Sequence, residues 1–121
     1  MKPLAQTQLQ TFLKRFENFK DAELRSLKIL SPTAMQLTLA VQDSARAFDW
    51  ITITLEFNGV SDAKLLDEQQ LLFIDMSEGI SLIFEDNLFA FGISECYNIS
   101  SIKNSSLYLI AESLKYEEGQ F

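Results

Sequence analysis

The feature of this sequence that most constrains its fold is a two-residue alternation of apolar and polar side chains, which begins after residue 22. It is clearest over residues 34–42 and 50–57. The apolar positions of these two runs are Met35, Leu37, Leu39, Val41, Ile51, Ile53, Leu55 and Phe57. Because successive side chains of a β-strand point to opposite faces, the alternation predicts strands with one buried and one open face.

Turn signals divide the rest of the chain into short segments of the same kind. Ser31-Pro32-Thr33 interrupts the pattern, and Asn58-Gly59 is a strong hairpin signal because both residues tolerate positive φ. Residues 98–106 are expected to form a loop, and residues 116–121 a polar tail. Strands are expected over residues 22–30, 34–42, 50–57, 60–66, 70–76, 80–85, 88–94 and 107–115. About eight short strands at this spacing favour a mainly β fold, either an antiparallel sandwich or a partly open barrel.

The N-terminal segment has a different period. Within residues 4–18, the apolar side chains of Leu9, Phe12, Leu13 and Phe16 recur at helical spacing. This pattern predicts one amphipathic helix that ends near Asn18 to Lys20 and packs on the sheet, because it cannot bury its apolar stripe alone. A length of 121 residues suits a single domain over residues 1–121.

The charge of the chain is unevenly distributed. Residues 1–60 hold seven Lys or Arg and six Asp or Glu, a net charge of +1. Residues 61–121 hold three Lys or Arg and eleven Asp or Glu, a net charge of -8, so the total is -7. An acidic surface repels nucleic-acid phosphates and anionic membranes. The charge therefore favours a cationic protein as partner, or serves solubility alone.

The side chains that most often carry catalysis are scarce. The chain has no histidine, the commonest general base near neutral pH, and its four glycines are scattered. We therefore predict no catalytic residue, no cofactor and no metal site. Cys96, the single cysteine, excludes an internal disulfide and is expected to be an inert, partly buried thiol. Without a signal peptide or a membrane-spanning apolar run, the sequence indicates a cytoplasmic protein.

Two acidic stretches are candidates for a chemical site. Glu85-Asp86-Asn87 lies between two apolar runs, and it favours a tight turn over a calcium or magnesium site. Asp67 and Glu68 favour a solvated loop over a catalytic pair, because neighbours within a loop rarely have different environments. The acidic residues after position 61 either form one patch that docks a basic protein or simply keep the surface soluble.

Trp50 is the most informative single residue for binding. The alternation places it on the face opposite Ile51, where it either packs under another element or anchors an interface. Packing is the favoured interpretation, because large aromatic side chains are mostly buried. The candidate partner-binding residues are Trp50, Asp62, Asp67, Glu68, Glu85 and Asp86.

Two stretches carry a resemblance to a known group of proteins. Phe19-Lys20-Asp21-Ala22, followed by an extended strand, and Leu55-Glu56-Phe57-Asn58-Gly59-Val60 resemble YxiG-like and immunity proteins of bacterial polymorphic-toxin systems. The resemblance implies a mostly β, non-enzymatic protein that binds and neutralises a toxin, and many such toxins are basic nucleases. Lys20 stands where the family pattern has histidine, so no role of that histidine carries over.

These observations leave three functional hypotheses. The favoured one is a non-enzymatic protein-binding domain that covers the basic surface of a partner such as a cognate toxin. The alternative is a small-ligand-binding or enzymatic β-domain with a pocket inside the sheet. The third is an assembly subunit that exposes an edge strand. The oligomeric state stays open, a dimer included.

Overall fold

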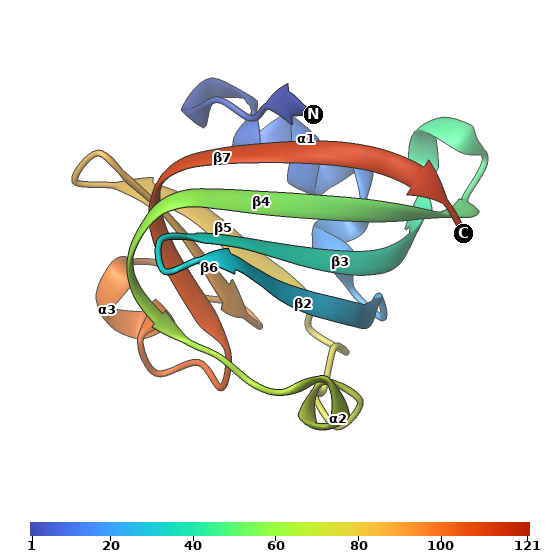
Figure 1. The fold of residues 1–121 in the computed structure, drawn as a ribbon. Coiled ribbons are helices and arrows are strands. Elements are labelled where there is room, and N and C mark those ends of the chain that lie inside the picture. The colour runs from blue at the N-terminus through green and yellow to red at the C-terminus, as the bar shows by residue number, and fades with distance from the viewer.

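All strand pairs of the protein are antiparallel, and they form one open sheet in the order β2-β3-β4-β7-β6-β5, with β1 added beside β7. The computed structural model describes residues 1–121 (Figure 1). The strands are β1 (Lys2–Pro3), β2 (Glu23–Ser31), β3 (Ala34–Asp43), β4 (Asp49–Lys64), β5 (Ile80–Glu85), β6 (Leu88–Ile93) and β7 (Tyr108–Gln120). This confirms a mainly β, antiparallel fold with an N-terminal helix packed on it.

The helical segments are all short. The α-helices are α1 (Leu9–Arg15), α2 (Glu68–Leu71) and α3 (Ile99–Ile102), and the 3-10 turns are η1 (Gln6–Gln8), η2 (Glu17–Phe19) and η3 (Ser44–Arg46). None of these helices has the length and apolar character that crossing a bilayer would require. In Figure 1, α1 lies behind the sheet, whereas α2 lies below it at one edge of the molecule.

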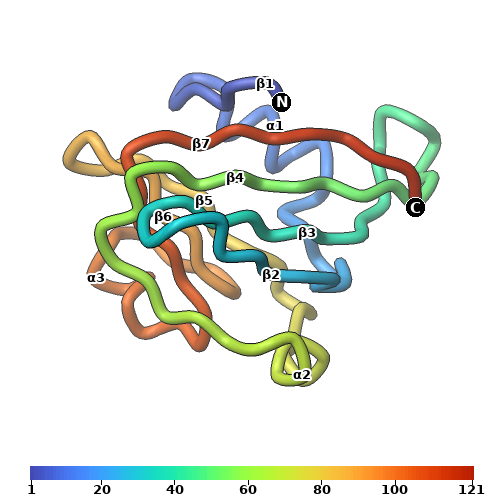
Figure 2. The backbone as a smooth tube through the Cα atoms, viewed as in Figure 1, coloured from blue at the N-terminus to red at the C-terminus, as the bar shows by residue number.

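The sheet curls because its two longest strands bend. The tube in Figure 2 shows β4 and β7 turning together at one end of the sheet, so that β5 and β6 pass behind β2 and β3. A register shift between Val60 and Asp62 marks the bend in β4, where Gly59 has a φ of +68°. An extra residue in one strand increases local twist and bends the strand. The bend creates the concave face that receives α1.

The core fills the space between the two layers of the curled sheet and α1. The apolar stripe of the helix is buried as predicted, together with Phe19 of η2. The inward residues of β3 and β4 that the alternation identifies are also buried. Full burial of one such side chain stabilises the fold by about 1.5–3 kcal/mol, so this cluster supplies most of the driving force. Together, 27 buried residues form one continuous hydrophobic core.

The predicted hairpin at Asn58-Gly59 is wrong. β4 continues through this dipeptide to Lys64, and the strand predicted over residues 60–66 is its second half. Gly59, with its positive φ, lies beside the register shift at the bend and not in a turn. Two predicted strands are therefore one, and the seven strands of the sheet include the two-residue β1, which the sequence pattern does not predict.

Three other segments differ from the prediction. Residues 70–76 are not a strand: α2 begins at Glu68, because the Asp67 side chain accepts a hydrogen bond from the Gln70 backbone N–H at 2.9 Å. The predicted loop at 98–106 contains α3, which Asn98 caps in the same way. The predicted polar tail belongs to β7, which pairs with β4 as far as Gln120.

The acidic stretch Glu85-Asp86-Asn87 forms the turn between β5 and β6, as predicted. Glu85 pairs with Leu88 across the hairpin, and only Asp86 and Asn87 connect them. Both connecting residues have positive φ, 53° and 62°. Two consecutive left-handed residues produce the turn whose twist matches a two-stranded hairpin, and Asp and Asn adopt this conformation more readily than most residues.

Candidate functional site

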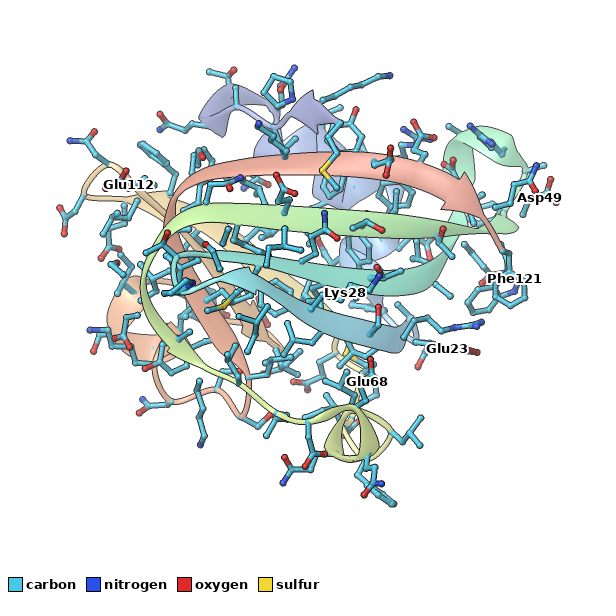
Figure 3. The ribbon with its side chains drawn as sticks, in the orientation of Figure 1. Glu23, Lys28, Asp49, Glu68, Glu112 and Phe121 are labelled. Atoms are coloured by element: carbon cyan, nitrogen blue, oxygen red, sulfur yellow. The ribbon has the colours of Figure 1, made fainter.

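The six predicted binding residues do not form one surface. Trp50 lies at the start of β4, and Glu85 and Asp86 lie at the tip of the β5–β6 hairpin. Ile51 pairs with Gln120, whereas Val60 pairs with Ala111, beside β6. Nine residues of strand separate these two positions, which is roughly 30 Å. In Figure 3, Asp49 and Glu112 accordingly lie at opposite ends of the long strands.

Trp50 is exposed, so the expectation that it packs under another element is wrong. Its side chain is 38% exposed and its ring centroid lies 5.5 Å from that of Phe121. The Arg25 guanidinium lies 4.8 Å from the Phe121 ring centroid. α1 packs on the opposite face of the sheet, so nothing covers this one. Trp50 is therefore part of a small aromatic cluster that is separate from the acidic residues.

Asp62 is already paired within the protein. Its carboxylate accepts a hydrogen bond from the Tyr108 hydroxyl at 3.1 Å and lies 3.4 Å from the Lys103 ammonium. Desolvation raises the pKa of Tyr108, and the hydrogen bond to Asp62 raises it further. These contacts join the second half of β4 to the region of α3 and β7. Asp62 is thus less available to a partner than the other acidic candidates.

One long stretch of the sequence contains no positively charged side chain. Between Lys64 and Lys103 the chain has no Lys or Arg. We call residues 65–102 the acidic segment; its seven acidic residues are Asp67, Glu68, Asp75, Glu78, Glu85, Asp86 and Glu95. The segment comprises α2, the hairpin of β5 and β6, and α3. It carries most of the negative charge that the sequence places in the second half.

The acidic segment also exposes two large apolar side chains. Leu72 is 78% exposed and Phe73 is 88% exposed, the highest values among the large apolar residues. We call the surface formed by α2 and the loop after it the α2 patch; its exposed residues are Asp67, Glu68, Leu72, Phe73, Asp75 and Glu78. Figure 3 shows Glu68 on the side of α2 that faces β2. The patch therefore combines apolar contact area with four carboxylates.

The local sequence explains why these apolar residues point outward. α2 is only four residues long, and it turns Leu71 into the core, where 3% of the side chain is exposed. Met76 reaches the core again from the following loop. A single helical turn buries one side only, so the two residues after Leu71 must face solvent. The Asp75 side chain accepts a hydrogen bond from the Ser77 N–H at 2.9 Å, which lowers the pKa of Asp75.

A cluster of ion pairs between Arg15, Arg46, Asp43 and Glu118 holds parts of the fold together, and the sequence pattern does not predict it. Asp43 is fully buried, and its carboxylate accepts hydrogen bonds from Arg15 Nε at 2.9 Å and Nη2 at 2.6 Å. Arg15 Nη2 and Arg46 Nη2 both donate to Glu118 Oε1, at 2.8 and 3.0 Å. The Arg15 guanidinium lowers the pKa of Asp43 below its usual range. The cluster ties α1 to β3 and β7, and the Asp43 carboxylate is occupied by these donors.

One hollow of the surface lies beside β5. It has a volume of about 340 Å³, and it is bordered by α1, the end of η2, β5 and residues 95–97. We call it the β5 groove. Cys96 borders it as a partly buried thiol, as predicted, and burial raises the pKa of that thiol. No three His, Cys, Asp or Glu side chains in the protein come together in a way that could hold a metal ion.

Several residues that carry the family resemblance are part of the core or of a strand bend. Phe19 and Phe57 are fully buried in the core, and Gly59 lies at the bend of β4. These buried positions help to build the fold, whereas Lys20 and Asp21 of the same stretch are exposed. The resemblance itself stays a prediction. Comparisons of the chain with models of protein families, with curated protein sequences and with solved structures find no match.

Proposed function

We propose that this protein acts in the cytoplasm by binding a cationic protein, and that it covers the partner's basic surface as an immunity protein covers its toxin. The observation that carries the proposal is the α2 patch. It presents two exposed apolar side chains within a stretch of the chain that has seven carboxylates and no cation. Exposed apolar groups bordered by polar residues are typical of protein-interaction surfaces.

The two parts of the α2 patch would have different roles in binding. Its carboxylates attract a cationic partner and raise the rate of association, an effect that salt screens over about 8 Å at physiological ionic strength. Phe73 and Leu72 supply contact area that becomes desolvated in the complex. Aromatic side chains near the centre of an interface often contribute 2 kcal/mol or more, roughly a 30-fold change in affinity.

The filled interior supports protein binding over the alternative of a ligand or enzymatic pocket inside the sheet. The space between the two layers is occupied by the core of 27 buried residues. The main hollows instead open at the surface, and their lining includes charged residues of α1 and the acidic segment. A surface of this kind suits a macromolecular partner.

Charge reversal within the α2 patch is expected to weaken binding at least about tenfold. The test variant is the double substitution Glu68→Lys and Glu78→Lys, and its matched control is Glu112→Lys with Glu117→Lys, which are exposed residues of β7. The partner is captured from cells that express the protein, purified, and titrated calorimetrically at low and high salt. Phe73→Ser is expected to weaken binding by a similar factor without altering the salt dependence.

The control variant is expected to bind within about threefold of the natural protein, because its charges lie on another part of the surface. Equal losses in the two double variants would contradict a role for the α2 patch. Capture of an acidic partner, or affinity that does not change with salt, would contradict the proposed function as a whole.

A further inference from the structure

We infer that the β5 groove receives an arginine side chain of the cationic partner; this inference rests on the proposed function. The groove has a volume of about 340 Å³ and is bordered by α1, the end of η2, β5 and residues 95–97. Ligand sites in proteins usually measure roughly 300–1,000 Å³, so this volume lies at the small end of the range. The groove therefore suits a single side chain and not a longer segment of a partner.

The lining of the groove is apolar at its base and more accessible toward its rim. The base consists of Leu13, Ile80 and Leu82, which are at most 7% exposed. Ile83 and Cys96 also border the groove, and they are only partly buried. An arginine side chain buries its aliphatic stem against surface of this kind and keeps its charged head near water.

Two carboxylates at the rim lack a partner. Ser94 N–H donates to Gly79 C=O at 2.8 Å, and Glu78 and Glu95 are the next residues outward on the two chain segments. Both glutamates border the groove, both are exposed, and neither forms an ion pair within the protein. Like charges on neighbouring segments repel each other, so a cation bound between them is stabilising.

Tyr97 makes arginine a better occupant than lysine. Its side chain is 76% exposed and borders the groove. A hydrogen bond with Glu95 raises the pKa of Tyr97, which shows that a carboxylate lies beside the phenol. A guanidinium stacks on an aromatic ring and binds a carboxylate through two N–H groups. Arg25 of this protein has the same combination, with Phe121 at 4.8 Å and Glu23 at 3.1 Å.

Lys20 is the only cation that borders the groove, and it does not neutralise the glutamates. It is exposed and forms no ion pair. Two carboxylates and one ammonium leave the groove with a net charge of -1. Lys20 therefore competes weakly with an incoming guanidinium, and removing its charge is expected to strengthen arginine binding about twofold.

The groove adjoins the α2 patch, because Glu78 belongs to both. A stable interface usually covers about 800 Å² on each partner, which is far more than one helical turn offers. A partner that is bound to the α2 patch therefore extends over the neighbouring surface, where the groove lies. One arginine in the groove would fix the orientation of that partner.

A second copy of this chain is a poor source of the arginine. The chain has three arginines, and all of them are engaged within the protein. Arg15 and Arg46 bind Asp43 and Glu118, and Arg25 pairs with Glu23. Docking one of them in the groove of another copy would require breaking an existing ion pair.

The test titrates the whole protein with Nα-acetyl-arginine amide and follows the backbone amide signals by two-dimensional NMR. The signals of Ile83, Cys96 and Tyr97 are expected to shift and to saturate, with a Kd of about 1–10 mM for this single side chain. Nα-acetyl-citrulline amide has nearly the same shape without the charge, and it is expected to leave these signals unchanged. Nα-acetyl-lysine amide is expected to bind more weakly than the arginine probe.

Variants assign the binding to the groove. Glu95→Gln is expected to weaken binding of the arginine probe at least about threefold, and Lys20→Gln to strengthen it about twofold. The matched control is Glu112→Gln, an exposed glutamate of β7 that does not border the groove. With the captured partner, Glu95→Gln is expected to lower the affinity by at least threefold, whereas the control is expected to leave it unchanged.

Four results would overturn the inference. They are no saturable shift up to about 50 mM arginine probe, equal shifts with the citrulline probe, lysine binding as tight as arginine binding, and equal effects of Glu95→Gln and Glu112→Gln.

The Phe73→Ser variant keeps the two proposals separate, because Phe73 does not border the groove. Loss of partner binding in Phe73→Ser, combined with normal partner binding by Glu95→Gln, would refute the role of the groove and leave the proposed function in place. Normal partner binding by Phe73→Ser would contradict the α2 patch, whatever the arginine probe shows.

Discussion

Replacing Asp43 with alanine is expected to lower the free energy of unfolding by about 3–5 kcal/mol. The substitution removes the carboxylate that holds Arg15 through two hydrogen bonds and leaves the guanidinium partly buried beside Glu118 alone. It also removes the acceptor for the Ala45 N–H, which starts the η3 turn. Urea denaturation followed by circular dichroism measures the change. A loss below about 1 kcal/mol would contradict a structural role for this ion pair.

The control is Asp49→Ala, which removes an aspartate from the other end of the same connection between β3 and β4. Asp49 pairs with Asp43 across the strands, but its side chain is exposed and makes no ion pair. Its replacement is expected to change stability by less than about 0.5 kcal/mol. The comparison separates the loss of a buried, paired carboxylate from a general effect of altering the loop.

The Asp43 carboxylate also makes the stability of the protein depend on pH in the acid range. The Arg15 hydrogen bonds lower the pKa of Asp43 below its unfolded value of about 3.9. The pair therefore contributes fully above that pH, and its contribution is lost as the pH falls through the lower folded-state pKa. We expect the stability difference between the natural protein and Asp43→Ala to be constant near neutral pH and to shrink below about pH 4. Urea titrations at several pH values measure this.

Gly79→Ala is expected to destabilise the protein by about 3–5 kcal/mol. Gly79 has a φ of +75°, a conformation that residues with a side chain rarely adopt. A Cβ atom at this position would also overlap the Asn18 carbonyl group and lie 3.0 Å from the Lys20 N atom. Both groups belong to the backbone, so no side-chain rotation relieves the contact. The change is measured by thermal and urea denaturation.

Gly92→Ala serves as the control for this prediction. A Cβ atom there would meet the Ile102 side chain at 3.3 Å, a contact that a small side-chain movement relieves. Its φ is not in the left-handed region, so the expected loss is only about 1–2 kcal/mol. Equal losses for the two variants would show that the approach of Gly79 to η2 has no special importance for the fold.

Much of the fold could be predicted because it follows from local patterns. The inward residues of β3 and β4 and the apolar stripe of α1 are visible as periods of two and about 3.6 residues. The Asn58-Gly59 prediction fails because a glycine with positive φ occurs in hairpin turns and also within a strand beside a bulge, as here. Only the pairing of Gly59 and its neighbours with β7 distinguishes them, and that pairing involves residues some fifty positions away.

The candidate site was less predictable, because it depends on which side chains the fold leaves uncovered. The sequence indicates that Asp67 and Glu68 are exposed, and the structure agrees. The apolar run that contains Leu72 and Phe73 looks like a buried strand, whereas the Asp67 cap makes it the end of a single helical turn. Asp67 with Gln70 three residues later was the available signal. The exposure of Trp50 had no such signal, since it depends on the position of α1.

The central place of β7 has a consequence for how the chain reaches its native state. β2, β3 and β4 connect to one another through short turns, as do β5 and β6, so each group can form from nearby residues. β7 alone joins the groups, and it does so through contacts between distant parts of the chain, which slow folding. Until residues 108–120 insert, the unpaired sides of β4 and β6 stay accessible to other nascent chains. Mutual repulsion among the carboxylates of the acidic segment would then discourage aggregation during this interval.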